Sequence, residues 1–469
     1  MRRGTDGAEP SNTEPSKAEP SKAEPLGGSA LKPPSNRRGR WIAASVVVGV
    51  VVVGAVGATA IVHHQVGASG TDGSSDPAAN TKLIARLADA VKTDPLNGST
   101  GIALDAPISV TTSIGHLVSV QVAPIGGQEL TGTLDAHSTQ WTESGALAAS
   151  TLYQVRTVVK SRSGLTTTAI SSFTTLTPAS WVSASLWPDD GLTVGVGQPI
   201  VLKFTQPITS LAARQTLLSH LSLSLSDPVP VGAYWFSETE MHLRPENYWP
   251  VGEQIFMAEN LNGWDATGGL WGQGIVTVRF AIGNSHISTA NLSTDEMTVT
   301  NNGQVVATYP ISGGRPEYPT MDGVHIVLDT EPQVQMISST VGIPVNSPDG
   351  YDETVYWDVH ISDSGEYVHA APWSVSDQGV TNVSHGCINI STANAQQFYG
   401  FSQIGDIVDV VGGPRPPAPG DHGVMDWTTP WSDFTPITVL PLNPPASTTT
   451  TTTPPSATTT SPSSSSYTQ

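Results

Sequence analysis

The chain has 469 residues, more than one hydrophobic core usually serves, so several domains are expected. Its formal net charge is −20. Residues 1–40 carry eight Lys or Arg and five Asp or Glu, so the remainder carries a net charge of −23. This acidic exterior argues against nucleic acid as a partner, because binding to phosphates requires basic patches.

The N-terminal part of the chain contains a polar leader and then an apolar run. Residues 1–40 are rich in Pro, Ser, Glu and Lys, a composition that cannot bury a core, and are expected to be disordered. Residues 41–62 are 22 residues without a charge, long enough to cross the hydrocarbon core as a helix. Arg37, Arg38 and Arg40 precede this run and place the N-terminus in the cytoplasm. The sequence therefore predicts a single-pass cell-membrane anchor, with the rest of the chain outside the cytoplasm.

A spacer and a first β-rich segment follow the anchor. Residues 63–95 are rich in Gly, Ser, Asp and Ala and are expected to be a linker, with a short helix near LIARLADAVK. Residues 96–180 contain short runs of alternating apolar and polar side chains, bounded by turn residues. Val118, Val120 and Val122 form one such run. This pattern predicts an immunoglobulin-like sandwich.

Residues 181–283 predict a second immunoglobulin-like β domain. Ile200, Leu202 and Phe204 alternate with polar or smaller neighbours and are expected on one buried face. Neither β segment contains a convincing catalytic cluster, so both are interpreted as spacer or binding modules.

Residues 284–411 form the third predicted domain, again mostly β. Asn302-Gly303 is the dipeptide preferred in a two-residue hairpin turn. A helix is expected to begin after Ser391 as N-cap and to stop at Gly400. Further strands are expected at Val324–Leu328, Thr354–Ile361 and Asp406–Val411.

Two segments complete the chain. Residues 412–440 contain many Pro, Gly and Trp and are expected to be an ordered extension packed on the third domain. Residues 441–469 consist mainly of Pro, Thr and Ser and are expected to be a disordered tail.

Cys387 is the only cysteine, so no intramolecular disulfide is possible. A lone cysteine is most often a small buried apolar group, but the neighbours of Cys387 favour a nucleophile. Such a nucleophile acts as a thiolate and needs a partner, usually imidazole, that takes its proton. His385 lies two residues before Cys387 and His369 lies 18 residues before it, and spacing alone does not choose between them.

Gly386 and Asn389 complete the motif around the cysteine. Gly386 allows a close backbone approach, and the backbone N–H groups of Gly386 and Cys387 are candidates to stabilise an oxyanion in acyl transfer. Asn389 is a candidate to orient the site or to bind a substrate amide. Each signal alone is weak, but the combined pattern of His-x17-Cys with SHGC-x-N is specific.

The stretch YVHAAPWSVSDQGVTNVSHGCINIS resembles the signature of the L,D-transpeptidase catalytic (YkuD-type) family, an upstream His followed by [S/T]HGC-x-N. The resemblance covers about residues 180–440, including VNSPDGY and GDIVDVV, and is strongest to multidomain actinobacterial members. It implies a β-rich catalytic domain at 284–411, preceded by immunoglobulin-like domains. With the anchor predicted above, the expected architecture is a mainly β protein with a membrane anchor helix, two immunoglobulin-like β-sandwich domains and this catalytic domain. It also implies that Cys387 is the nucleophile and that His369, held by the main-chain carbonyl of Ala370, is its partner.

The same resemblance implies a substrate pocket and no cofactor. The hydroxyl of one pocket residue, Tyr351, would also support the oxyanion. Some relatives bind calcium through an Asp and a Glu in the second β domain. Asp265 matches the Asp but Gly268 replaces the Glu, so no metal is expected. The residues implied to bind substrate are Tyr351, Ser364, Gly365, Asn389, Trp373 and Met336.

The activity implied by the resemblance is peptidoglycan transpeptidation in cell wall biogenesis. Cys387 would attack the carbonyl between the third and fourth residues of a tetrapeptide stem, releasing D-alanine. The side-chain amine of a second stem's diamino acid would then form a 3→3 cross-link. The implied partners are donor and acceptor stem peptides, with carbapenem-type β-lactams as inhibitors. Two alternatives remain: a cysteine hydrolase that uses water as acceptor, and a non-enzymatic wall-binding protein.

Overall fold

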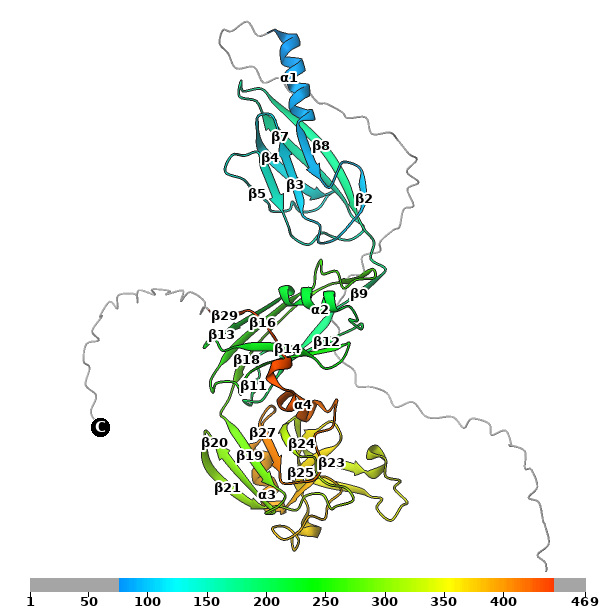
Figure 1. Ribbon diagram of the computed structural model, residues 1–469, viewed down its shortest axis with the longest axis vertical. Coiled ribbons are helices and arrows are strands. Elements are labelled where there is room, and N and C mark those ends of the chain that lie inside the picture. The colour runs from blue at the N-terminus through cyan, green and yellow to red at the C-terminus, as the bar shows by residue number, and fades with distance from the viewer. Residues whose placement is uncertain (1–75, 443–469) are drawn as a thin grey trace, which may run out of the picture. The chain divides into compact units, whose positions relative to one another are not determined.

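The computed structural model of the protein describes residues 76–442 (Figure 1). This part of the chain is mainly β, as predicted. The predicted anchor at 41–62 and the predicted disordered segment at 1–40 lie outside the described residues, as does nearly all of the predicted tail at 441–469. Between residues 76 and 442, no helix has the length and apolar character needed to cross a membrane.

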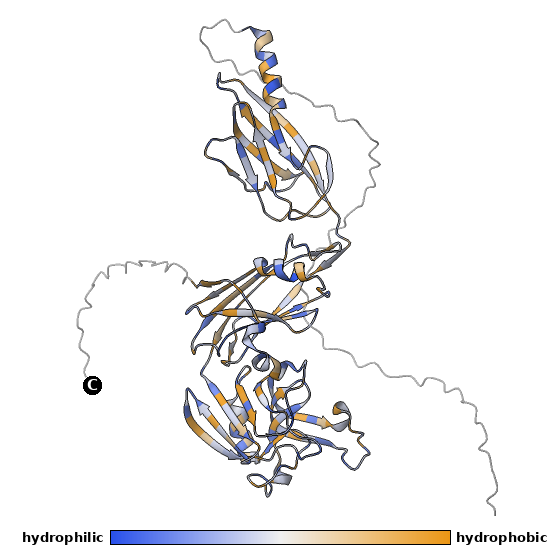
Figure 2. Cartoon of the chain, viewed as in Figure 1, coloured by the Kyte–Doolittle hydropathy of each residue, from blue (hydrophilic) through white to orange (hydrophobic). Residues whose placement is uncertain are grey.

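The first β domain is a sandwich of two four-stranded sheets. Hydrophilic and hydrophobic residues alternate along its strands (Figure 2), and the apolar set fills the core between the sheets. One sheet has the order β1 (Val91–Asp94), β3 (Ile108–Thr112), β6 (Gln140–Glu143), β5 (Thr133–Leu134). The other has the order β2 (Ser99–Ile102), β8 (Thr166–Thr175), β7 (Leu152–Lys160), β4 (His116–Pro124).

This domain begins earlier than the predicted boundary at residue 96. Helix α1 (Pro77–Asp89) and strand β1 lie in the predicted linker, and β1 pairs antiparallel with β3. Leu87 is fully buried and Val91 packs against the core, so these apolar side chains place the segment in the domain.

Strand β4 departs from the predicted valine alternation. Its register against β7 shifts between Leu117 and Ser119. Val118 is therefore 50% exposed, whereas Val120 and Val122 are buried. The predicted face is wrong at Val118, because one extra residue in a bulge reverses the inward and outward alternation.

The second β domain contains two five-stranded sheets. Ile200, Leu202 and Phe204 are buried on one face of β12, as predicted. The short helix α2 (Leu211–Leu217) and the turn η1 (Leu218–His220) precede β13. One sheet has the order β10 (Ala184–Trp187), β12 (Ile200–Phe204), β15 (Glu240–Pro245), β14 (Val231–Trp235), β28 (Thr435–Pro436). The other has the order β11 (Thr193–Val194), β18 (Ile275–Ile282), β16 (Gln254–Asn260), β13 (Leu221–Leu225), β29 (Val439–Pro441), and β9 (Ser180–Val182) pairs separately with β17 (Leu270–Gly272).

The third domain is built on two further sheets, and helix α3 (Thr392–Phe401) packs on β24 and β25 of the second one. The first sheet has the order β21 (Gln304–Pro310), β20 (Glu296–Asn301), β19 (His286–Asn291), β27 (Ile407–Val411), β22 (Gly323–Ile326). The second has the order β23 (Asp329–Ile337), β24 (Asp352–Ser362), β25 (Glu366–Ala370), β26 (Ile388–Ile390). The turns η2 (Ser338–Val341) and η3 (Pro372–Ser374) follow β23 and β25.

Local signals in this domain are mostly confirmed. Asn302 and Gly303 have φ values of 49° and 78° and connect β20 to β21 as a two-residue turn. The Ser391 hydroxyl accepts a hydrogen bond from the Asn394 N–H at 3.3 Å, as expected for an N-cap. Gly400 does not stop α3, which continues to Phe401.

The C-terminal extension packs on two domains, not on the third alone. Helix α4 (His422–Thr428) lies on β22 and β24 of the third domain. After the turn η4 (Trp431–Asp433), β28 pairs antiparallel with β14, and β29 pairs parallel with β13. The extension therefore adds one edge strand to each sheet of the second β domain.

The second and third domains also share a core. Ile326 and Ile407 of the third domain belong to the buried cluster of the second domain. Trp427 of α4 packs against the same cluster, and its Nε1–H donates to the Gly197 carbonyl at 2.9 Å. Apolar side chains of the extension thus face the second domain. The predicted packing on the third domain alone therefore missed the contacts of the extension with the second domain.

Candidate functional site

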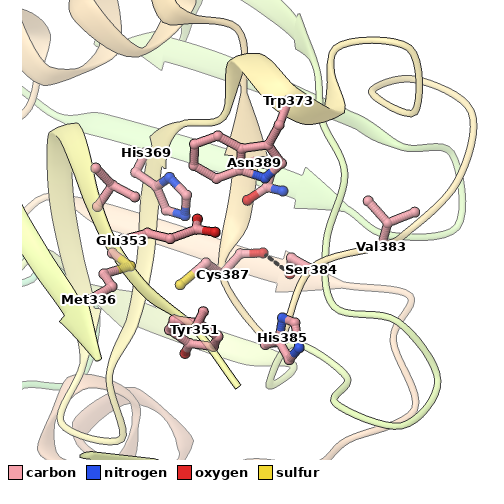
Figure 3. A pocket seen from close by; sticks show the side chains of 11 residues that line it. Met336, Tyr351, Glu353, His369, Trp373, Val383, Ser384, His385, Cys387 and Asn389 are labelled. Carbon is pink, nitrogen blue, oxygen red and sulfur yellow. Dashed lines mark hydrogen bonds between the residues drawn. The ribbon is translucent and has the colours of Figure 1, made fainter. Parts of the chain in front are cut away.

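Two neighbouring parallel strands, β25 and β26, hold the residues of the predicted motif. His369 of β25 is opposite Asn389 of β26. Cys387 directly precedes β26, so this register brings its side chain next to β25. Figure 3 shows the His369 imidazole above the Cys387 side chain in the same pocket.

The chain before Cys387 is a tight turn and not an extended strand. Gly386 has a φ of 130°, a conformation that side-chain-bearing residues rarely adopt. The Ser384 hydroxyl donates to the Cys387 carbonyl at 2.5 Å and accepts the Gly386 N–H at 3.1 Å. The Gly386 N–H is therefore already used within the turn, which argues against its predicted place at an oxyanion.

The buried His369 has a defined tautomer. Its Nδ1 lies 3.0 Å from the Ala370 carbonyl oxygen. Because a carbonyl can only accept, Nδ1 carries the proton and Nε2 has the free lone pair. This is the arrangement that the family resemblance implied for His369 and Ala370.

His385, the other candidate partner, belongs to an aromatic group at the pocket wall. Its ring centroid lies 5.2 Å from that of Tyr318 and 5.1 Å from that of Tyr351. Figure 3 places His385 beside Tyr351, whereas His369 lies on the other side of Cys387, where its imidazole points into the pocket. The geometry therefore favours His369 over His385 as the group that receives the thiol proton.

Cys387 opens into a cavity of about 240 Å³. Trp373 is 55% exposed at its edge, with its ring centroid 6.1 Å from that of His369. Asn389 is buried, and its Nδ2 donates to the Ser374 hydroxyl at 3.1 Å, so it orients the segment that carries Trp373. The predicted residues that line the cavity are Met336, Tyr351, His369, Trp373, His385, Cys387 and Asn389.

Ser364, Gly365 and Gly386 were also predicted as site residues, but they are not in the cavity lining. Ser364 is exposed, and its N–H donates to the Asp421 carboxylate at 3.0 Å. The Gly365 carbonyl oxygen lies 3.9 Å from the Cys387 sulfur. Ser364 and Gly365 therefore belong to the turn between β24 and β25, which contacts the Cys387 sulfur, and neither residue lines the pocket.

Comparison with known proteins finds two family models along the chain. Residues 285–410 match the model of the L,D-transpeptidase catalytic domain, and residues 99–265 match that of a bacterial Ig domain. L,D-transpeptidase 2 of Mycobacterium tuberculosis is 37% identical over 338 residues, which cover 72% of this chain and 82% of that protein. The chain belongs to the L,D-transpeptidase family. The prediction of a peptidoglycan L,D-transpeptidase is thereby confirmed, as is an immunoglobulin-like character before the catalytic domain, although the bacterial Ig match crosses the predicted boundary at residue 180.

Another curated relative agrees with this assignment. L,D-transpeptidase 1 of Mycobacterium tuberculosis is 37% identical over 231 residues, which cover 49% of this chain and 84% of that protein. A solved LD transpeptidase in complex with imipenem is 35% identical, covers 50% of this chain and 99% of its own, and has a TM-score of 0.43.

The thiol and the imidazole of this L,D-transpeptidase are both neutral at rest. Burial, only partly opposed by the Tyr367 backbone N–H, raises the pKa of Cys387 to about 12, and the charges of Glu366 and Asp358 add to the rise. Burial lowers the pKa of His369 to about 4. An ion pair is therefore disfavoured before substrate binds, and the proton must move as the sulfur attacks.

Tyr351 keeps its proton in this L,D-transpeptidase. Burial, with smaller contributions from the negative charges of a Cys387 thiolate and of Glu353, raises the pKa of its hydroxyl to about 12. A protonated hydroxyl at the cavity wall can donate a hydrogen bond to an oxygen that becomes negative during acyl transfer.

Four lining residues of this L,D-transpeptidase were missed by the sequence reasoning. Glu353 and Val355 follow Tyr351 at intervals of two, the period at which side chains along a strand share one face. That alternation could have identified both. Ser384 lies inside the quoted motif, and Val383 directly precedes it. Among the residues that line this cavity, Glu353 is the only carboxylate.

Proposed function

We propose that Cys387 is the nucleophile and His369 its proton acceptor in a transpeptidation between peptidoglycan stem peptides. The observation that carries this proposal is the shared pocket of the thiol and an imidazole whose Nδ1 is held by Ala370 at 3.0 Å. The free Nε2 is the only ring nitrogen able to receive a proton, and it belongs to the residue that faces the thiol.

The first half-reaction is acylation. As the Cys387 sulfur attacks the carbonyl between the third and fourth stem residues, its proton passes to Nε2 of His369. The carbon–nitrogen bond then breaks, and the departing D-alanine amine takes that proton. The product is a thioester on Cys387, with both side chains ready for the second half-reaction.

The oxyanion formed in each half-reaction needs a donor. The Tyr351 hydroxyl supports this role, because it lines the cavity and its raised pKa of about 12 keeps it protonated. The Gly386 N–H, already bonded to Ser384 at 3.1 Å, is not needed for this step.

The second half-reaction is attack by the side-chain amine of an acceptor stem's diamino acid, which gives a 3→3 cross-link. His369 takes a proton from this amine as the thioester breaks. Glu353, an exposed carboxylate in an otherwise uncharged or weakly basic lining, supports an amine as acceptor because it attracts an ammonium group. Water is uncharged, so the Glu353 carboxylate does not attract it in this way.

Carbapenem-type β-lactams are proposed to acylate the same thiol, because they present a strained carbonyl to the nucleophile. The uncharged residues 41–62, preceded by Arg37, Arg38 and Arg40, support a membrane anchor that holds the catalytic domain outside the cytoplasm, in the cell wall. Protease accessibility on intact cells tests this placement: cleavage of the catalytic domain without cell lysis is expected.

The decisive experiment incubates the protein with a tetrapeptide-stem substrate and identifies products by mass spectrometry. The expected product is a 3→3 dimer with release of D-alanine, and the Cys387→Ala and His369→Ala variants should form none. A carbapenem should add its mass to the wild-type protein but not to Cys387→Ala.

Two results would redirect the proposal. Release of D-alanine without dimer, even with excess amine acceptor, would indicate a hydrolase. Dimer formation by Cys387→Ala would exclude Cys387 as the nucleophile.

A further inference from the structure

The turn between β24 and β25 contacts the back of the Cys387 side chain. The Gly365 N–H donates to the Ser362 carbonyl at 2.9 Å and closes the turn. Gly365 has a φ of 88°, in the region where only glycine is unstrained. Its carbonyl oxygen then points at the Cys387 sulfur, 3.9 Å away. The position of this carbonyl depends on the conformation of the turn.

A single carboxylate from the C-terminal extension binds this turn. Asp421 is 5% exposed. One of its oxygens accepts the Ser362 hydroxyl at 2.6 Å and the Ser364 N–H at 3.0 Å. The other accepts the Asp363 N–H at 3.1 Å and, as the N-cap of α4, the Gly423 N–H at 3.0 Å. Three of these four bonds go to the turn.

Asp421 is itself held by contacts on both sides of α4. A Cβ atom at Gly423 would lie 2.6 Å from the Ile361 carbonyl oxygen, so glycine is required for α4 to approach β24. One helical turn later, the buried carboxylate of Asp426 lies 2.9 Å from Nδ1 of His242 in the second β domain. The carboxylate of Asp421 therefore has little freedom to move with the turn.

We propose that Asp421 is a positioning residue for the nucleophile: it fixes the turn 362–365 so that the Gly365 carbonyl holds the Cys387 thiol in its rotamer and keeps it protonated. A carbonyl that accepts from S–H favours the neutral thiol over the thiolate. The inference rests on the proposed role of Cys387 and assigns a part in catalysis to an extension that no motif identified.

Several titratable groups surround Asp421, the turn 362–365 and the Cys387 thiol. The test must therefore distinguish the effect of moving the turn from the effect of removing the charge of Asp421. Asp421→Asn removes a charge as well as acceptor capacity, and the charge of Asp421 influences Glu366 and His325. Ser362→Ala removes one hydrogen bond to Asp421 without changing any charge. The groups that face the turn or the thiol are Asp363, His360, His325, Glu366, Arg415, Asp358, Tyr351 and Tyr367. Those that face or belong to α4 are His422, Asp426, His242 and Glu240.

The experiment measures two reactions of Cys387 in the full-length protein, at temperatures where melting curves show it folded. One is alkylation by iodoacetamide across pH, which reports the thiol pKa. The other is acylation by a carbapenem, which requires correct placement of the sulfur. In Asp421→Asn, acylation should slow roughly tenfold or more, as expected for a misplaced nucleophile. The alkylation profile should move to lower pH by about half a unit, the equivalent of a weak hydrogen bond.

Two further variants make the result decisive. Ser362→Ala should show both effects in the same direction, and it decides the question if Asp421→Asn does not fold. Asp433→Asn, an exposed carboxylate elsewhere in the extension, should change neither reaction. A folded Asp421→Asn or Ser362→Ala protein with wild-type acylation and an unshifted alkylation profile would overturn the proposal, even if its melting temperature were lower. Failure of the wild-type protein to form dimers would instead count against the proposed function.

Discussion

Substitution of His242 gives the most informative test of the contact between the second β domain and the C-terminal extension. Its ring is 2% exposed, with Nδ1 2.9 Å from Asp426 and Nε2 2.8 Å from Glu240. Burial alone would lower the pKa of His242, but the two carboxylates outweigh it and raise the pKa from 6.5 to about 9. The folded protein therefore binds a proton that the unfolded chain releases at lower pH.

The rise in pKa sets the magnitude and the sign of the effect on stability. A rise from 6.5 to about 9 corresponds to about 3 kcal/mol, at about 1.4 kcal/mol for each pKa unit. This contribution is fully present below pH 6.5 and is lost as the pH rises through about 9. His242→Gln removes the cation and leaves Asp426 and Glu240 buried without it, so its cost should be greatest at low pH.

Melting curves of the wild-type and His242→Gln proteins, recorded from pH 6 to pH 10, measure this difference. At pH 6 the variant should melt roughly 6–12 °C lower, given about 2–4 °C for each kcal/mol in a unit of this size. At pH 10 the two curves should approach each other. His137→Gln, at an exposed site of the first domain, should melt like wild type. A difference that stays constant or grows with pH would refute the assignment of a buried cation at His242.

Further predictions concern the site and the extension. Because the Cys387 and His369 pKa values are about 12 and about 4, carbapenem acylation should vary little between pH 6 and pH 9; a bell-shaped profile in that range would contradict a neutral resting pair. Tyr351→Phe should slow acylation roughly 10²-fold without lowering the melting temperature, and stopped-flow kinetics with calorimetry would measure both. Gly386→Ala should abolish acylation, because a φ of 130° is strained for alanine, and mass spectrometry after carbapenem treatment would detect a surviving adduct. Trp427→Ala should destabilise the protein by about 3 kcal/mol in urea unfolding, through lost packing and the lost bond to the buried turn between β11 and β12.

Sequence reasoning was strongest where one local rule decides the outcome. The turn at Asn302-Gly303 and the cap at Ser391 follow from backbone preferences of those residues, and both are confirmed. It failed at Val118, where a bulge adds one residue to β4, since nothing in the local alternation marks the extra residue.

In the site, too, local sequence patterns predicted some features, and contacts between distant segments determined the others. The pattern around Cys387 identified part of the cavity lining, but it left open the choice between His369 and His385, which depends on the turn at Gly386. Asp421 carried no recognisable signal, because its hydrogen bonds join segments that are 57 to 59 residues apart in the chain. Long-range contacts of this kind leave no periodicity for a single sequence to show.

The two edge strands supplied by the extension determine when the second β domain can be finished. Strands β14 and β13 emerge from the ribosome about 200 residues before β28 and β29, which pair with them. Until residues 435–441 arrive, both sheets have an open edge and the shared core lacks part of its cover. A chain interrupted after Asn389 would thus contain the whole catalytic motif but lack the strands that complete the second β domain. The second β domain can therefore close both sheet edges only after residues 435–441 are synthesised, and a chain truncated before them is expected to be digested faster by added protease than the full-length chain.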